Sequence, residues 1–251
     1  MTLVPRGGQQ APVGRVVEPA ELGAAERDEM FVLLDRHVLH ARRERFEREL
    51  DASQWVLLLT APGSGRVEGF ATVRRIATDM DHLPVVALVS GSTIVAPARR
   101  GSVALPRLWA RVMFSLAAGD RLEGARAFWL LAASGVRTYR LLPVFFRHYI
   151  PCCFVETPPW AARLRDRLGE LAFGEAYEPG RGIVRFPEPT PLRPGVADLA
   201  PARRRDPHVA YFCSENPGHL TGDELVCLAE ISEPNLTAAG RRMLGLPGEL
   251  R

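Results

Sequence analysis

The residues best suited to chemistry form a short turn between a predicted strand and a predicted helix. The turn Arg99–Ser102 follows the apolar run Val86–Val95 and precedes a strongly periodic segment that begins near Ala104. A helix N-terminus presents unpaired backbone N–H groups and a partial positive charge, and arginine adds a fork of donors. This pattern predicts a site for an anionic group such as a pyrophosphate. An ordinary connection with solvated arginines is the competing interpretation.

The segment after the turn has the apolar spacing of an amphipathic helix. Its large apolar residues recur at intervals of three and four: Leu105, Leu108, Trp109, Val112, Met113 and Leu116. Pro106 is tolerated only in a first helical turn, where its missing N–H costs nothing, so the helix is expected to begin near Val103 or Ala104. Gly101 lets the backbone approach a ligand closely.

The composition is that of an ordinary soluble globular protein. The chain has 251 residues, of which 47% are hydrophobic and 24% charged. This length suits one large domain or two small ones. No apolar run reaches the roughly 18 residues that span a bilayer, and the N-terminus lacks a signal pattern. We therefore expect a cytoplasmic protein without a membrane partner.

The charges of the chain argue against nucleic acid and against lysine chemistry. The net charge is only +3, and no basic helix with interleaved aromatic residues stands out, which ranks an arginine-rich nucleic-acid binder low. Every Lys or Arg position holds arginine, so no lysine can form a Schiff base or hold a phosphate.

The cysteines do not predict a metal site. The four are Cys152, Cys153, Cys213 and Cys227, and none has the CxxC spacing. The grouping of Cys213 and Cys227 with His219 matches no zinc pattern, so no metal is expected. In a cytosolic protein these thiols are expected to be reduced.

Hydrophobic periodicity divides the chain into a series of elements. Residues 1–20 are expected to form a mobile arm, 77–84 a looser segment and 187–207 a linker or surface loop. Predicted helices cover 21–50 with a break near His40, 104–116, a short stretch from Pro143 to before Pro151, 160–173, 222–231 and 235–244. Predicted strands cover 55–60, 67–76, 86–95, 126–133, 182–186 and 209–213.

The order of these elements, with these residues, resembles the GNAT superfamily of N-acyltransferases. The resemblance covers residues 21–155 and rests on the hairpin Trp55–Ile76, on Ser92–Pro97 leading into Arg100–Ala104, and on the strand Phe128–Ala133. It implies an α/β protein with a mixed (α+β) sheet, in which 156–251 form a C-terminal extension packed on the core. Of the family's turn pattern, Arg100 and Gly101 are present, whereas Val103 and Leu105 stand at the later glycine positions.

The resemblance also implies a donor and its binding residues. In that family the strand before the turn splays from its neighbour, pantetheine pairs with its exposed backbone, and the turn amides hold the pyrophosphate. The donor would be acyl-CoA, such as acetyl-CoA, or an acyl carrier protein. The implied cofactor-binding residues are Ile94, Val95, Arg99, Arg100, Gly101, Ser102, Val103 and Ala104.

The implied reaction moves an acyl group to the amine of a small molecule or amino-acid-like acceptor, by direct attack in a ternary complex. The alternative is a non-catalytic module that binds acyl-CoA or a carrier protein. A second copy of the chain is a further candidate partner, through a dimer surface on the extension.

Acyl transfer to an amine needs a base, a polarised thioester oxygen and a proton donor for the leaving thiolate. The family's usual donor is a tyrosine after the Phe128 strand, which implies Tyr149, with Tyr139 second. Either could equally be a core tyrosine. The exposed edge of the strand Ser90–Val95 would supply a backbone N–H to the thioester oxygen. Candidates for the base are Glu68, Asp81 and His82, while Ser92 would orient the substrate, and a water chain could replace all of these side chains. A covalent route through Cys152, activated by His148, is the remaining alternative.

Overall fold

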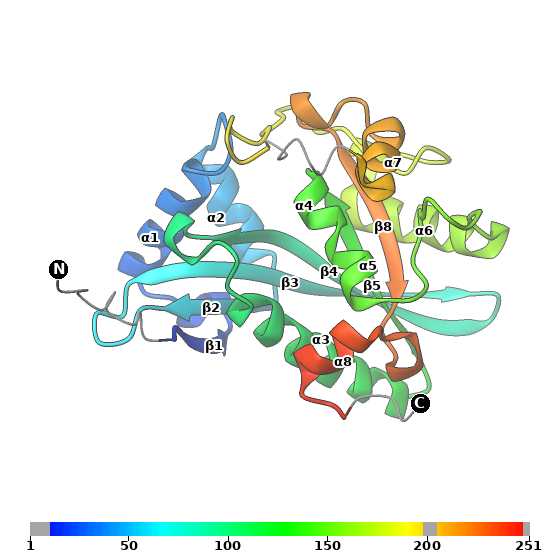
Figure 1. The fold of residues 1–251 in the computed structure, drawn as a ribbon, viewed down its shortest axis with the longest axis horizontal. Helices are drawn as coiled ribbons and strands as arrows, with labels where there is room; N and C mark the ends of the chain where they lie inside the picture. The colour runs from blue at the N-terminus through cyan, green and yellow to red at the C-terminus, as the bar shows by residue number, and fades with distance from the viewer. Residues whose placement is uncertain (1–10, 198–204, 248–251) are drawn as a thin grey trace, which may run out of the picture.

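The computed structural model describes residues 11–197 and 205–247, which share one mixed sheet (Figure 1). The order of its strands is β1-β2-β3-β4-β5-β8-β7-β6, and every neighbouring pair is antiparallel except β4 and β5. The strands are β1 (Val13–Val17), β2 (Trp55–Thr60), β3 (Val67–Met80), β4 (Leu83–Val95), β5 (Arg126–Ala133), β6 (Tyr177–Glu178), β7 (Ile183–Val184) and β8 (Glu224–Glu230).

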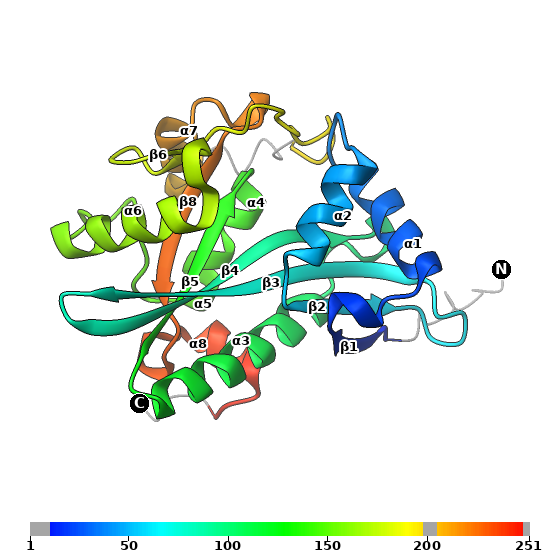
Figure 2. The same cartoon turned by 180° about the vertical axis from the view of Figure 1, so that it is seen from behind.

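Helices cover both faces of this sheet, as the two opposite views show (Figures 1 and 2). One face carries α1 (Ala24–Asp35), α2 (Arg43–Asp51) and α6 (Pro159–Phe173). The other carries α3 (Ala104–Leu122), α4 (Val136–Tyr139), α5 (Leu141–Phe145), α7 (Pro207–Glu215) and α8 (Ala238–Leu244). None of the helices among the described residues is long and apolar enough to cross a bilayer.

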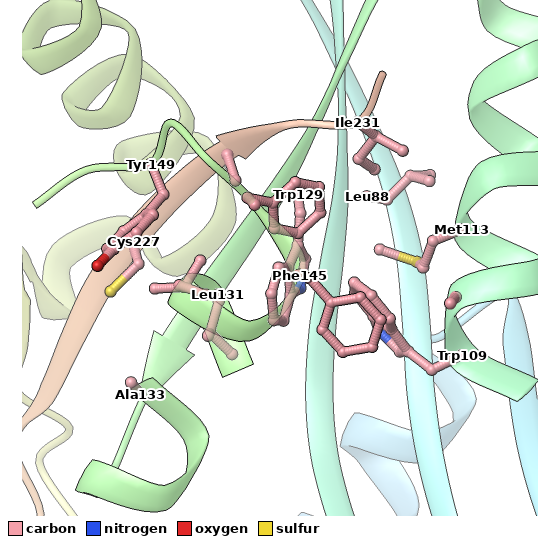
Figure 3. Close-up of a cluster of buried hydrophobic side chains, with 14 of the residues drawn as sticks. Leu88, Trp109, Met113, Trp129, Leu131, Ala133, Phe145, Tyr149, Cys227 and Ile231 are labelled. Atoms are coloured by element: carbon pink, nitrogen blue, oxygen red, sulfur yellow. The ribbon is translucent and has the colours of Figure 1, made fainter. Parts of the chain in front are cut away.

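The predicted helix after the turn is α3, and it packs as its periodicity indicates. It begins at Ala104, and Pro106 lies in its first turn. Its apolar side buries Leu105, Trp109 and Met113 against the sheet. Trp109 stacks at a tilt on Trp129 of β5, with ring centroids 4.4 Å apart (Figure 3). This contact fixes the start of α3 against the centre of the sheet.

The β3–β4 hairpin is longer than the sequence suggests. The segment 77–84, expected to be loose, pairs regularly, with Ala77 opposite Val86 and Met80 opposite Leu83. Asp81 and His82 form the tip, where both residues have positive φ. Two such residues between paired strands form the tight turn whose twist matches that of a hairpin. Aspartate and histidine tolerate this conformation better than most residues, which is why no glycine marks the turn.

β4 and β5 run side by side only up to Ser90 of β4 and Leu131 of β5. Their parallel pairing extends from Val85 opposite Arg126 to Ser90 opposite Leu131, after which β4 continues to Val95 without a partner on that side. The β3–β4 register shifts at the same level, between Ala71 and Val73, which marks a bulge. A Cβ on Gly91 would lie 2.3 Å from Oγ1 of Thr72, so a larger residue at this bulge would have to displace the Thr72 hydroxyl.

Residues 156–251 add strands to the same sheet. β8 pairs antiparallel with β5, and α6 packs over β3, β5 and β8. The expectations for 222–231 and 209–213 were wrong: the first forms β8 and the second lies in the helix α7. The Leu, Ala and Glu residues of β8 favour a helix in isolation, but β5 and β7 pair with its two edges and the side chains on both of its faces are buried. In α7, Asp206 caps the N-terminus and Pro207 occupies the first position.

Two other segments are more ordered than expected. Within the predicted N-terminal arm, Val13–Val17 form β1, an edge strand that pairs with β2; residues 1–10 lie outside the described residues. Within the predicted linker, residues 187–197 cross from β7 to the loop between α1 and α2. Leu192 bridges Val38 there, and the Arg193 N–H donates to the His37 carbonyl. The last part of that linker, 198–204, lies outside the described residues.

Candidate active site

A cavity of about 660 Å³ lies where β4 leaves β5. Its walls come from both faces of the sheet: Leu105 and Trp109 on the α3 side, and Phe46 and Phe173 on the α2 and α6 side. The cavity therefore passes through the sheet at the gap between the two strands. A donor entering from one face and an acceptor entering from the other could meet there.

The predicted anion-binding turn lies at one end of this cavity. The backbone N–H groups of Arg99, Arg100 and Ser102 donate to carbonyl oxygens within the turn. Those of Gly101, Val103 and Leu105 donate to no acceptor in the part of the chain that the structure describes. The open donors thus alternate along the entry to a helix of 19 residues. Together with the helix dipole they favour an anion.

The two arginines of the turn differ in what they can bind. The Arg99 Nε donates to the Glu68 carboxylate at 2.7 Å, and both side chains are about nine-tenths buried. Arg100 is exposed and lines the cavity. Gly101 has a φ of 88°, which favours glycine, and a Cβ there would have no neighbour within 4 Å. Arg100 is therefore available to a phosphate, whereas the charge of Arg99 is already neutralised by Glu68.

The free edge of β4 offers further backbone donors. The Ala96 N–H donates to the Glu68 carbonyl of β3, so Ala96 and Ile94 face β3. Alternate residues of an antiparallel strand point their backbone groups to opposite sides. Thr93 and Val95 consequently present their N–H and C=O groups to the gap that β5 has left. Of the two predicted pantetheine contacts, Val95 has the backbone orientation to pair with a ligand and Ile94 has not.

Ser90, at the apex of the gap, has no counterpart among the predicted site residues. Its Oγ accepts hydrogen bonds from Trp109 Nε1 at 3.2 Å and Trp129 Nε1 at 2.9 Å. The sequence places two tryptophans and several serines in these elements but does not pair them. The predicted Ser92 also lines the cavity, beyond the apex on β4.

A carboxyl group without a partner lines the cavity on the α2 and α6 side. The side chain of Glu224, the first residue of β8, makes no ion pair or hydrogen bond with any residue in the described ranges. Burial, and to a lesser extent the charge of Glu49, raises the pKa of Glu224 to about 8, which Arg45 opposes. Glu49 itself is paired with Arg45 at 2.6 Å. Sequence reasoning missed Glu224 because it assigned this segment to a helix.

The two predicted catalytic tyrosines lie outside the cavity walls. The Tyr139 hydroxyl donates to the Pro151 carbonyl oxygen at 3.0 Å, and the Tyr149 hydroxyl lies 3.2 Å from Nδ1 of His208. Burial raises the pKa of both phenols. Tyr149 follows α5 in irregular structure and belongs to the same buried cluster as Cys227 of β8 (Figure 3). A role for either tyrosine as proton donor stays a prediction.

The other sequence candidates are also apart from the cavity. Asp81 lies at the tip of the β3–β4 hairpin, 3.6 Å from Arg163. The backbone N–H of His148 donates to Asn235, and the predicted nucleophile Cys152 forms an isolated β-bridge with Val155. Its neighbour Cys153 has its Sγ 3.3 Å from Nδ1 of His208. Burial raises the pKa of the Cys153 thiol, which disfavours the thiolate. The described residues hold no cluster of three or more His, Cys, Asp or Glu side chains suited to a metal ion.

No family model matches the sequence, and no curated protein gives a significant match. Solved structures do match over about half of the chain. A protein of Enterococcus faecalis V583, described as a probable N-acyltransferase, is 18% identical over 55% of this chain and 33% of its own, with a TM-score of 0.40. A GCN5-related N-acetyltransferase from Kribbella flavida is 16% identical over 55% of this chain and 34% of its own, with a TM-score of 0.37.

An Escherichia coli GNAT family N-acetyltransferase in complex with CoA is 17% identical over 49% of this chain and 63% of its own, with a TM-score of 0.36. The chain thus spans about a third of the first two proteins and less than two thirds of the third. Over about half of its length, this chain is similar to structures described as GNAT family N-acetyltransferases or as a probable N-acyltransferase.

Proposed function

We propose that this protein is an N-acyltransferase that moves an acyl group from acyl-CoA to an amine. The observation that carries the proposal is the cavity through the sheet, with open backbone donors along β4 and at the turn before α3. An extended pantetheine arm pairs with a free strand edge as another strand would. A pyrophosphate then meets Gly101, Val103, Leu105 and Arg100, which offer the anion-binding donors.

The other end of the cavity supports an amine acceptor. Glu224 offers an unpaired carboxyl whose pKa, raised by burial to about 8, suits a base that works near neutral pH. It takes one proton from the acceptor's ammonium group, and the free amine attacks the thioester carbon. The N–C bond forms, the C–S bond breaks, and the thiolate receives the second amine proton. The aromatic side chains of Phe173 and Phe186 line the cavity, which favours an acceptor with an apolar stem.

Calorimetry with coenzyme A tests the donor site. Arg100→Ala should weaken binding about 10-fold or more, because a charge-assisted hydrogen bond contributes roughly 1.5–3 kcal/mol. Arg111→Ala is the matched control, since Arg111 is an exposed arginine of α3 outside the cavity walls. Absence of coenzyme A binding, or equal affinity in both variants, would contradict the proposed site. Pantetheine alone should bind more weakly than coenzyme A, whereas equal binding would favour a carrier protein as donor.

Thiol release from acetyl-CoA tests the reaction. Phenethylamine should accelerate release, and 2-phenylethanol, a neutral analogue of similar shape, should not. Glu224→Gln should abolish most of the amine-dependent rate while leaving coenzyme A affinity unchanged. If acetyl-CoA binds but no primary amine in a broad panel accelerates its turnover, the non-catalytic binding module is the better description.

A further inference from the structure

The Ser90 hydroxyl is held between two indole groups at the apex of the gap. Trp109 of α3 and Trp129 of β5 both donate their Nε1–H to Ser90 Oγ, at 3.2 and 2.9 Å. All three residues are buried, with Ser90 about 5% exposed, and all three line the cavity. The two indole rings pack against each other, and the Trp109 ring also packs against Phe145 (Figure 3).

This arrangement leaves the hydroxyl with a donor and no acceptor. A serine hydroxyl has one hydrogen and two lone pairs, and the two indoles occupy the lone pairs. Ser90 donates to no acceptor among the residues that the structure describes. An indole N–H can only donate, so neither tryptophan can take the hydrogen. A buried donor without a partner is costly, so the hydrogen is available to whatever occupies the cavity.

The position of Ser90 matches the place where a thioester would lie. Ser90 is the last residue of β4 that pairs with β5, and the open edge begins directly after it. From Ser90 to Val95 the strand spans roughly 16 Å, at about 3.3 Å per residue. A pantetheine arm that leaves the turn and follows this edge brings its sulfur end toward the apex.

We propose that the Ser90 hydroxyl donates a hydrogen bond to the carbonyl oxygen of the bound acyl thioester. This inference rests on the proposed function, because it presumes an acyl-CoA along β4. The two indole donors polarise the hydroxyl and strengthen its own donation. Negative charge develops on the carbonyl oxygen as the amine attacks, so the hydrogen bond is stronger in the transition state than in the ground state. No proton leaves Ser90.

The alternative is that Ser90 only satisfies two buried indoles. Both roles predict that Ser90→Ala lowers stability, because it leaves two indole N–H groups without an acceptor. Only the proposed role predicts a change at the thioester carbonyl itself. The test therefore has to measure a property of the thioester carbonyl, because a change in the protein's melting temperature would fit both roles.

Infrared difference spectroscopy with acetyl-CoA carrying a ¹³C-labelled carbonyl gives this readout. The carbonyl stretch of bound acetyl-CoA should shift to lower frequency in the wild type, and the shift should be lost in Ser90→Ala. Ser53→Ala is the matched control: Ser53 lines the same cavity, but its hydroxyl already donates to the Leu50 carbonyl at 2.6 Å. The control should keep the shift. With an accepted amine, kcat of Ser90→Ala should fall ~10²–10³-fold, with acetyl-CoA affinity changed less than about 3-fold.

The outcomes separate this inference from the proposed function. If wild-type protein does not bind acetyl-CoA, the proposed function fails and the inference fails with it. If acetyl-CoA binds and the carbonyl frequency is the same in wild type and Ser90→Ala, the inference alone is overturned. Should Ser90→Ala not fold, Trp109→Phe replaces it. This variant keeps the hydroxyl but removes one of the two indole donors that polarise it, so it should reduce the shift if the proposal holds.

Discussion

The Glu68 carboxylate and the Arg99 guanidinium form a buried ion pair at 2.7 Å that ties β3 to the turn before α3. Arg99 follows the last residue of β4 by four positions, and Glu68 pairs through its backbone with Ala96 at the same level. The pair therefore anchors the anion-binding turn to the sheet. Two residues predicted to do chemistry separately instead neutralise each other.

Removing one partner of this pair should destabilise the fold more than it weakens ligand binding. Arg99→Ala leaves a buried carboxylate without its counter-charge, which typically costs about 3–5 kcal/mol. Denaturant unfolding measures this cost. The double variant Arg99→Met/Glu68→Leu should recover much of the loss, because it removes both buried charges. Additive losses in the double variant would show that the two side chains act independently.

Gly91→Ala should destabilise the bulge that opens the gap. The new Cβ would lie 2.3 Å from Oγ1 of Thr72, and overpacking of this kind costs about 1–3 kcal/mol. Adding Thr72→Ala removes the obstructing atom, so the double variant should melt close to Thr72→Ala alone. The melting temperatures of the wild type, the two single variants and the double variant check this expectation. If the double variant is as unstable as Gly91→Ala, the bulge does not depend on Thr72.

Glu224 should make stability fall with rising pH. Its pKa of about 8 in the folded protein lies above the usual value of 4.5, so the folded state keeps the proton when the unfolded chain has lost it. The contribution of this group is fully present below pH 4.5 and is lost as the pH rises to about 8. Glu224→Gln should therefore stabilise the protein more at pH 9 than at pH 5. In thermal melting, each kcal/mol gained in the free energy of unfolding should raise the melting temperature by roughly 2–4 °C. Glu49, Arg45, Arg74 and His219 also line this cavity.

The matched control for this pH series is Glu230→Gln. Glu230 ends the same strand, but it is paired with Arg126 at 2.8 Å and lies outside the cavity walls. Neutralising Glu230 should not produce a gain in melting temperature that grows with pH. A gain of equal size in both variants would point to net charge as the cause and not to the burial of Glu224.

A fragment that ends near Val155 should fail to fold cooperatively. It loses β8, which pairs with β5 from Ala133 to Phe128, and α6, which covers the other face. The apolar residues Trp129 and Leu131 would then lie beside an unpaired strand edge. We expect binding of a hydrophobic dye and loss of a sharp melting transition. A soluble fragment with cooperative melting would instead make 156–251 a separable unit.

Elements with strong local signals could be placed from the amino-acid sequence alone. Pro106, the apolar spacing after it and the Arg-Arg-Gly-Ser turn placed the start of α3 within one residue of its observed position. The apolar runs of β2, β4 and β5 were equally clear, because buried strands need continuous apolar sequence.

Contacts between residues far apart in the sequence depend on strand pairing and helix packing, which local patterns do not specify. Glu224 became part of the cavity because pairing with β5 and β7 overrode the helical preference of its segment. The hydroxyl of Ser90 accepts two hydrogen bonds because Trp109 and Trp129, from a helix and a neighbouring strand, converge on its oxygen atom. The pairing of Arg99 with Glu68 likewise depends on the register of β3 and β4. Local sequence records the type of each residue, whereas register and packing determine which partner each one meets.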